Sequence, residues 1–428
     1  MNKQQRKIVG AAAVLGLSVL ASGANATQGY FQAGFDAVQK SFAGGGIADS
    51  ETATSIAINP AGLFDVGQQA NIGLTFLTVW PEYNATDTGF IAPGSANSNK
   101  NFYPLPFAAY SQPLDADNAI GLAIYGNGGL GSTYNIYNPN TKSGGVFGGG
   151  TTGVEILQVF ISPDYAHRFG NFSIGIAPVI SLQRFDAWGL AALKADSETP
   201  QNVTNQGNNW SVGIGLRAGA QWTAAPGLRL AVAGITPVVS TDFTSYRGLF
   251  ANHGQFNSAA TITAGLSYDV NQAVTANFDY KHIFYSGVGS IGNSGNIPPL
   301  LGSIGGPGFG WRDVNVFTIS GEWRGAPTFT LRAGYAYNTQ PIPSSDIVFN
   351  ILAPAVVQNH ISAGFSYNFL PHQSIDFGAI FAPRQTVSGT VPTSLGGGRV
   401  TLSLWEFEAT VGYTFKFGAP AAPVVAKY

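Results

Sequence analysis

The chain has 428 residues, of which only 10% are charged, whereas soluble domains usually contain about 25% charged residues. Glycine occurs 56 times, aromatic residues make up 12%, and the formal net charge is −2. The absence of cysteine excludes disulfides, thiolate metal sites and cysteine nucleophiles. The mildly acidic balance, without a basic patch, argues against a nucleic-acid partner.

Residues 1–26 are predicted to form a signal peptide. A basic start is followed by the apolar stretch Ile8–Ala21, and Ala24-Asn25-Ala26 provides a small-residue cleavage site. A membrane anchor is the weaker interpretation, because the stretch is too short to span a bilayer and no stop-transfer pattern follows. No later apolar run approaches about 18 residues, so membrane-spanning helices are not expected.

The next segment, residues 27–68, contains Gly44–Leu63, GGGIADSETATSIAINPAGL. Three glycines, a short acidic turn and a Ser/Thr/Ala stretch do not build a core of their own. Asn59-Pro60-Ala61 suits a tight bend, because proline lacks a backbone donor and an asparagine side chain bonds nearby backbone. We interpret this segment as a plug (a hatch) for the rest of the chain; an extension outside the barrel is the alternative.

From Gln69 onward, apolar and polar residues alternate with the period of a β-strand. In the last such segment Trp405, Phe407, Ala409, Val411, Tyr413 and Phe415 share one face, and Glu406, Glu408, Thr410, Gly412 and Thr414 share the other. In a membrane barrel the apolar face meets lipid and the polar face meets the lumen.

Fourteen such segments are predicted, at 69–80, 103–113, 118–134, 154–169, 172–187, 209–222, 228–244, 259–270, 273–286, 312–324, 328–339, 358–369, 373–383 and 401–417. Short turns alternate with long connections along the whole series. Outer-membrane barrels show this asymmetry, with short periplasmic turns and long external loops. The predicted fold is therefore all-β: a 14-stranded antiparallel transmembrane β-barrel over 69–417, with a periplasmic tail at 418–428.

A barrel of this size would leak polar solutes if its lumen were empty, since eight strands leave a filled interior whereas sixteen to eighteen leave a channel. We therefore expect residues 27–68 to fold into the lumen.

The third predicted strand contains Gly126-Asn127-Gly128-Gly129-Leu130-Gly131, which matches the glycine spacing of dinucleotide-binding loops. No helix follows it, so a nucleotide site is not expected. Glycines inside a strand mark bulges or close approach of another backbone.

Two long loops, Ser290–Phe309 and Asp346–Val357, are unusually apolar. They either pack on each other or form a hydrophobic funnel that captures substrate. The funnel residues we propose are Ile297, Leu300, Leu301, Ile304, Phe349, Ile351 and Leu352.

Few basic residues could hold a substrate carboxylate. The candidate anchors are Arg332, Arg217, Lys281 and Arg312. The first three are predicted to face the lumen, where Asp279, Glu406 and Glu408 could instead pair with them. An uncharged hydrophobic substrate therefore remains open.

Catalysis is not expected. A hydrolase would need a serine, a histidine and an orienting group within hydrogen-bond reach. The histidines, however, lie near different strand ends or loops and none accompanies a serine motif: His167, His253, His282, His360 and His372. No metal site or cofactor is predicted.

Several motifs, in order along most of the mature chain, resemble the FadL-type family of outer-membrane transporters for long-chain fatty acids and for toluene or xylene. They are Gly34-Phe35, Gly44–Asp49 (GGGIAD), Asn59-Pro60-Ala61-Gly62, Gly126–Leu130, Gly310-Trp311-Arg312-Asp313, Leu331–Tyr335, Pro341-Ile342-Pro343 and Ile361-Ser362-Ala363-Gly364.

The resemblance implies a monomeric barrel in the Gram-negative outer membrane, in contact with its lipid. It places the hatch at Gly44, Gly45, Gly46, Asp49, Asn59, Pro60 and Ala61, and a lateral gate at Gly126, Asn127, Gly128 and Gly129. The implied function is passive uptake of hydrophobic small molecules, released sideways into the bilayer. A general diffusion porin and a structural or adhesive barrel are the alternatives.

Overall fold

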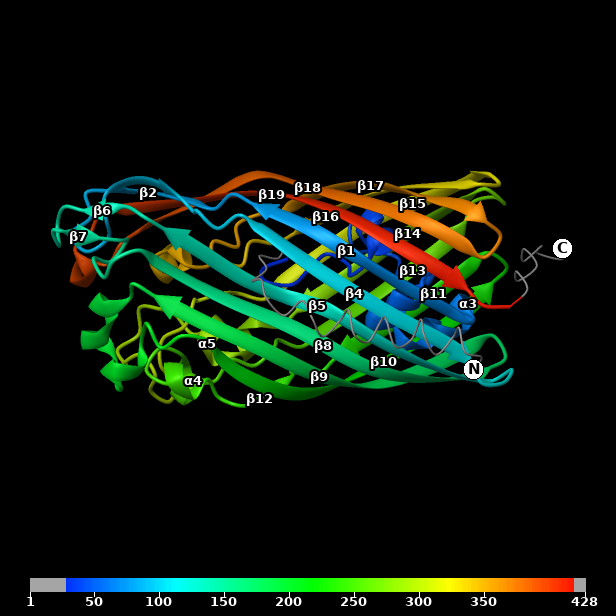
Figure 1. The fold of residues 1–428 in the computed structure, drawn as a ribbon, viewed down its shortest axis with the longest axis horizontal. Coiled ribbons are helices and arrows are strands. Elements are labelled where there is room, and N and C mark those ends of the chain that lie inside the picture. Colours follow the sequence, from blue (N-terminus) through cyan, green and yellow to red (C-terminus); the bar gives the residue numbers. More distant parts are fainter. Residues whose placement is uncertain (1–27, 419–428) are drawn as a thin grey trace.

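A computed structural model describes residues 28–418, and most of them form one closed antiparallel barrel (Figure 1). The predicted signal peptide, residues 1–26, and all but the first residue of the predicted tail, 418–428, lie outside the described residues. The barrel strands are β1 (Gln69–Val79), β4 (Phe102–Pro113), β5 (Asn118–Tyr134), β8 (Thr152–Phe169), β9 (Phe172–Trp188), β10 (Asn209–Ala225), β11 (Leu228–Ile235), β13 (Thr261–Asp269), β14 (Val274–Ile283), β15 (Val314–Ala326), β16 (Phe329–Asn338), β17 (Asn359–Leu370), β18 (Gln373–Thr390) and β19 (Arg399–Lys416).

The predicted count of fourteen barrel strands is confirmed. The sheet closes because β1 pairs with the last strand as well as with its neighbour: Gln69 lies opposite Lys416 of β19 and opposite Ser111 of β4. Five shorter strands lie in the long connections: β2 (Glu82–Thr86), β3 (Gly94–Asn97), β6 (Tyr137–Asn138), β7 (Ser143–Gly144) and β12 (Val239–Ser240).

The two faces of the barrel wall are those that the alternation predicts. In β19, Phe407 and Val411 are 41% and 45% exposed, whereas Glu406 and Glu408 are each 1% exposed. Outward apolar side chains recur in the other strands, for example Ile214 of β10 and Ile319 of β15, which are also exposed. This apolar outer surface is what a lipid-facing barrel requires.

Long and short connections alternate along the whole barrel, so the long loops gather at one end (Figure 1). The loops contain short helical turns: η3 (Ala191–Asp196), η4 (Pro200–Asn202), η5 (Thr244–Tyr246), α4 (Ala251–Gly254), η6 (Tyr285–Gly287), α5 (Gly289–Gly292), η7 (Ser344–Asp346), η8 (Phe349–Ile351) and η9 (Thr393–Leu395). Within residues 28–418, no helix has the length and apolar character needed to cross a membrane.

The largest errors in the predicted strand boundaries lie at the ends of two strands. The strand predicted at 228–244 ends at Ile235, because Pro237 has no N–H for the ladder, and pairing resumes at Val239 with a shifted register. The strands predicted to end at 383 and to begin at 401 extend to Thr390 and from Arg399, past an irregularity between Ala382 and Gln385.

The N-terminal segment 28–68 lies inside the barrel (blue in Figure 1). Its elements contact strands on different sides of the wall: α2 (Ala37–Ser41) contacts β16 to β19, η1 (Ala53–Ala57) contacts β4 and β5, η2 (Pro60–Gly62) contacts β8 to β10, and α3 (Leu63–Val66) contacts β4, β5 and β8. Because these contacts fall on several sides of the wall, the segment occupies the lumen.

Candidate functional site

The glycine turn at Gly44–Gly46 is bound to the wall by one carboxylate. Asp279 of β14 accepts hydrogen bonds from the backbone N–H of Gly46 at 2.8 Å and of Ile47 at 2.9 Å. A Cβ on Gly45 would lie 2.7 Å from Oδ2 of Asp279, so a side chain there would displace the turn. The three glycines therefore permit a close approach of backbone to carboxylate.

Ion pairs connect the acidic part of the segment to two arginines of the wall. Arg229 reaches Asp49 at 3.0 Å, and Arg332 pairs with Glu51 and, at 3.3 Å, with Glu322. Burial raises the pKa of Asp49 to about 6, and the neighbouring Glu51 carboxylate adds to the rise.

Asp49, Glu51 and Glu322 each present an oxygen within 4.8 Å of the others, a spacing that could hold a metal ion. Arg332 and Arg324 already pair with Glu322, so these carboxylates have cationic partners within the protein. We interpret this group as an ion-pair network that holds the segment in place.

Asn59-Pro60-Ala61 forms a fixed bend against β9 and β10. The Asn59 side chain accepts from Ala61 N–H at 3.1 Å and donates to Ile47 carbonyl at 3.3 Å. Ser173 of β9 donates to the Ala61 carbonyl at 3.0 Å. The trio thus joins two parts of the segment to each other and to the wall.

The glycines of β5 accompany a β-bulge. Gly126 lies opposite Val159 and Gly128 opposite Gln158, so Asn127 is an extra residue in β5. The bulged stretch pairs with the N-terminal segment: Gln32 donates its N–H to the Asn127 carbonyl at 3.2 Å.

This pairing needs glycine at one position in particular. Phe31 forms a bridge with Gly128, and Gly129 donates to the Tyr30 carbonyl at 3.0 Å. A Cβ on Gly128 would lie 1.9 Å from that carbonyl oxygen. Gly126 meets only the end of the Gln32 side chain, at 3.1 Å.

The ladder between β4 and β5 ends at Phe107 and Tyr125, just before the bulge. Beyond this point β4 continues its ladder with β1 as far as Phe102. Pro104 and Pro106 lie in that part of β4, and proline suits a strand edge because it has no N–H to donate. Sequence reasoning missed these two prolines, although their place in a strand is a signal of an edge.

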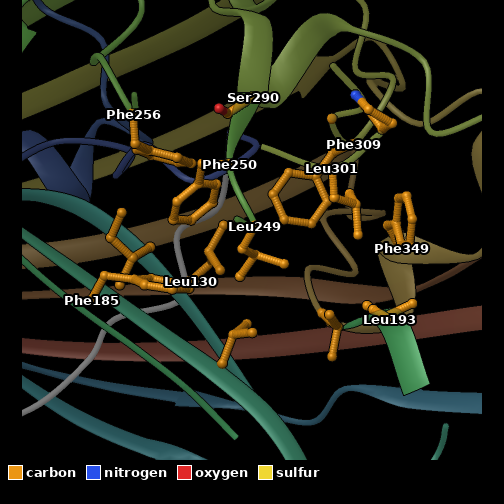
Figure 2. Close-up of a pocket in the computed structure, with 15 residues that line it drawn as sticks. Leu130, Phe185, Leu193, Leu249, Phe250, Phe256, Ser290, Leu301, Phe309 and Phe349 are labelled. Carbon is orange, nitrogen blue, oxygen red and sulfur yellow. The ribbon is translucent and has the colours of Figure 1, made fainter. Parts of the chain in front are cut away.

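A cavity of about 530 Å³, partly open to solvent, lies between the outer loops and the barrel wall (Figure 2). We call it the outer pocket. Residues from several loops and strands line it: Leu130, Val154, Ile156, Phe185, Leu193, Leu249, Phe250, Phe256, Ser290, Leu301, Pro307, Gly308, Phe309, Phe349 and Leu352. None of these lining residues is charged, and the Ser290 hydroxyl donates to the Gln255 carbonyl at 2.6 Å.

Three of the seven predicted funnel residues, Leu301, Phe349 and Leu352, line the outer pocket. The other four do not. Ile304 and Leu300 are 78% and 46% exposed on the loop surface, Ile297 is half-buried, and Ile351 is buried elsewhere. Phe250 and Phe256 were missed, because they come from a loop whose composition shows no apolar run.

Two of the four candidate anchors meet at a second cavity of about 540 Å³, inside the lumen. We call it the lumen cavity; Arg217 and Lys281 line it, together with Asn127. Arg217 donates to Tyr125 at 2.5 Å, and Lys281 donates to Gln28 at 2.9 Å. Arg332 belongs to the ion-pair network, and Arg312 is exposed at the loop end.

Within the described part of the chain, no salt bridge joins Arg332, Arg217 or Lys281 to the partners expected for them, Asp279, Glu406 and Glu408. Glu408 pairs with Lys40 of the N-terminal segment, and Arg332 pairs with Glu51 and Glu322. Lys40 and Glu51 come from the N-terminal segment, which is distant in sequence, so the alternation pattern carried no information about them, whereas Glu322 lies opposite Arg332 on the neighbouring strand β15.

A closed barrel with an apolar outer surface and long loops at one end defines an outer-membrane β-barrel. Within this class the chain has the fold of the FadL-type transporters that its motifs resemble. Residues 260–415 match a family described as outer membrane protein transport protein (OMPP1/FadL/TodX).

Solved structures of this fold cover almost the whole chain. The Pseudomonas putida toluene transporter TodX has 16% identity and a TM-score of 0.66 over 90% of this chain and 99% of its own. A Pseudomonas aeruginosa FadL homologue has 16% identity and a TM-score of 0.69 over 91% and 100%. The Ralstonia pickettii toluene transporter TbuX has 18% identity and a TM-score of 0.61 over 90% and 99%. No curated protein sequence matches the chain.

Proposed function

We propose that this barrel takes up uncharged hydrophobic small molecules passively across the outer membrane and releases them sideways into the bilayer. The observation that carries the proposal is the outer pocket, an apolar cavity without a charged lining residue at the loop end of the barrel. Such a cavity favours a ligand that gains by leaving water and needs no counter-charge. The solved structures of similar fold include two named toluene transporters.

The N-terminal segment 27–68 is proposed to act as the hatch. Its supports are the carboxylate of Asp279, the Arg229 and Arg332 ion pairs and the Asn59–Ala61 bend. A segment held on several sides excludes water from the lumen better than a loosely attached one. This favours a carrier over a general diffusion porin, which would need an open lumen.

The exit is proposed to lie where the β4–β5 ladder ends, beside the bulge at Asn127. A barrel otherwise has no edge, so a break in pairing is the place where cargo could leave through the wall. We propose that the protein works as a monomer, with bilayer lipid as the acceptor of its cargo.

Two adjacent leucines test the outer pocket. Leu301 lines it and is 5% exposed, whereas Leu300 is 46% exposed and does not line it. Leu301→Asn places an amide against the ligand, and an unpaired buried polar group costs about 1–3 kcal/mol, so toluene uptake should fall about tenfold. The measurement is uptake of labelled toluene by cells that lack other hydrocarbon channels.

Leu300→Asn is the matched control and should leave toluene uptake unchanged. Equal uptake by both variants and the native protein would exclude the outer pocket from the path. A structural or adhesive barrel would show no protein-dependent toluene uptake at all.

A fatty-acid carboxylate is the second candidate cargo, because Arg217 and Lys281 line one cavity inside the lumen. If cargo is uncharged, Arg217→Gln and Lys281→Gln should each leave toluene uptake within about twofold, as is usual for changes that remove no ligand contact. Uptake of labelled oleate is measured in parallel. A selective loss of oleate uptake in both variants would identify a carboxylate anchor and reject the uncharged cargo.

A further inference from the structure

Glu406 of β19 is a buried carboxylate for which the described residues provide no hydrogen bond. It is 1% exposed, and neither of its oxygens has a donor. Glu408, two residues further on the same face, is in a different situation, because it pairs with Lys40. Lys40 also donates to Gln32 at 3.0 Å.

Glu406 faces a small cavity, which we call the inner pocket; its empty space of about 260 Å³ includes a part that is open to solvent. Apart from Glu406, its lining is apolar or backbone: Gly29, Pro81, Gly129, Leu130, Trp311, Ala353, Pro354, Ala355 and Leu404. Trp311 has its indole N–H bound to Asn350 at 2.6 Å, so that donor is not available to Glu406.

The inner pocket adjoins both the outer pocket and the β5 bulge. Leu130 lines both pockets, and Gly129 belongs to the stretch that pairs with the N-terminal segment. A molecule that moves from the outer pocket toward the end of the β4–β5 ladder would therefore pass the Glu406 carboxylate.

We propose that Glu406 accepts a hydrogen bond from a neutral hydroxyl group of the cargo, which makes phenols and related hydrophobic alcohols the preferred substrate class. A buried carboxylate without a donor is costly, and a ligand that supplies one removes that cost. The apolar lining takes the hydrocarbon body, and the single acceptor selects the hydroxyl, a combination that discriminates strongly against analogues lacking it. This assignment rests on the proposed uptake of uncharged hydrophobic molecules.

The test uses phenol and toluene, which differ by a hydroxyl in place of a methyl group. We expect the purified protein in detergent to bind phenol about tenfold more tightly than toluene, after correction for partition into detergent, because only phenol supplies a donor to the buried acceptor. Glu406→Leu should abolish this preference and retain toluene binding. Isothermal titration calorimetry measures both affinities.

Glu406→Gln keeps one acceptor and the side-chain volume, so it provides a second folded variant in case Glu406→Leu fails to fold, and it should reduce the preference. Leu301→Asn, in the outer pocket, is the control and should leave the phenol-to-toluene ratio unchanged, because Leu301 does not line the inner pocket. A phenol-to-toluene ratio that is the same in the native protein and both Glu406 variants would overturn the assignment. So would tighter binding of benzylammonium than of benzyl alcohol, which would make the ligand a cation.

The two proposals fail separately. Native protein that neither binds nor takes up toluene would reject the uptake function itself. Native protein that carries toluene but shows no preference for phenol would reject only the role of Glu406.

Discussion

Deleting Asn127 should strongly slow the release of hydrocarbon into the membrane while the barrel still folds. The bulge sets Gly126 and Gly128 on opposite faces of β5, so removing one residue restores a regular ladder with β8 and keeps every other side chain on its present face. The straightened strand would continue its ladder along β4 past Phe107. About two new hydrogen bonds at about 1 kcal/mol each would then have to break for cargo to leave, which reduces uptake roughly thirtyfold.

The measurement is uptake of labelled toluene, with heat-modifiable gel mobility as the check of folding. Asn127→Ala is the control, because it keeps the bulge and loses only the side-chain bond to Gln158 at 3.0 Å. It should retain most of the uptake. Adding Pro104→Val and Pro106→Val to the deletion supplies two more backbone N–H donors on β4, so toluene uptake should fall further. Native uptake in the deletion variant would move the exit away from β5.

Removing residues 27–68 should convert a nearly closed barrel into an open pore. The wall has fourteen strands, between the eight that side chains fill and the sixteen of aqueous channels, so its lumen conducts ions once the segment is gone. We expect small or brief currents from the intact protein and large, steady ones from the deletion variant in planar bilayers.

A milder variant keeps the segment present. Lys40→Met removes the buried partner of Glu408, and loss of one member of a buried ion pair costs about 3–5 kcal/mol, so the segment should detach intermittently and give brief openings. Arg384→Gln breaks the pair with Glu82 at the loop end, away from the segment, and should leave the current unchanged. Large, steady currents from the intact protein would reject the hatch and favour a porin.

The three cavities differ in their electrostatic character, and this difference bears on the cargo. The outer pocket has no charged lining residue, the inner pocket contains Glu406, and the lumen cavity contains Arg217 and Lys281. A carboxylate ligand in the inner pocket would find no cationic side chain among the lining residues, whereas a hydroxyl would find an acceptor in Glu406. The phenol measurement therefore tests whether the cargo carries a hydroxyl group, and the oleate measurement tests whether it carries a carboxylate.

Most of the barrel could be predicted because its physical cause is local. A strand presents alternate residues to lipid and lumen, so the faces of Phe407, Glu408 and Arg217 could be read from the alternation. The sorting of connections by length predicted which end carries the loops. Breaks in strand pairing were harder to predict, because proline does not have the same effect at every position. Pro237 follows the end of β11, whereas Pro104 and Pro106 lie inside β4.

The segment Gly44–Leu63 shows the limit most clearly. Its composition alone indicated that it has no core of its own and needs a place to bind. Only the tertiary structure decided that Asp279, Arg229 and Arg332 hold it, because these partners lie some 180 or more residues away and pairing over such distances leaves no periodic pattern in the chain. The same reason applies to Glu406: its inward face follows from alternation, but its lack of a donor depends on which distant side chains reach it.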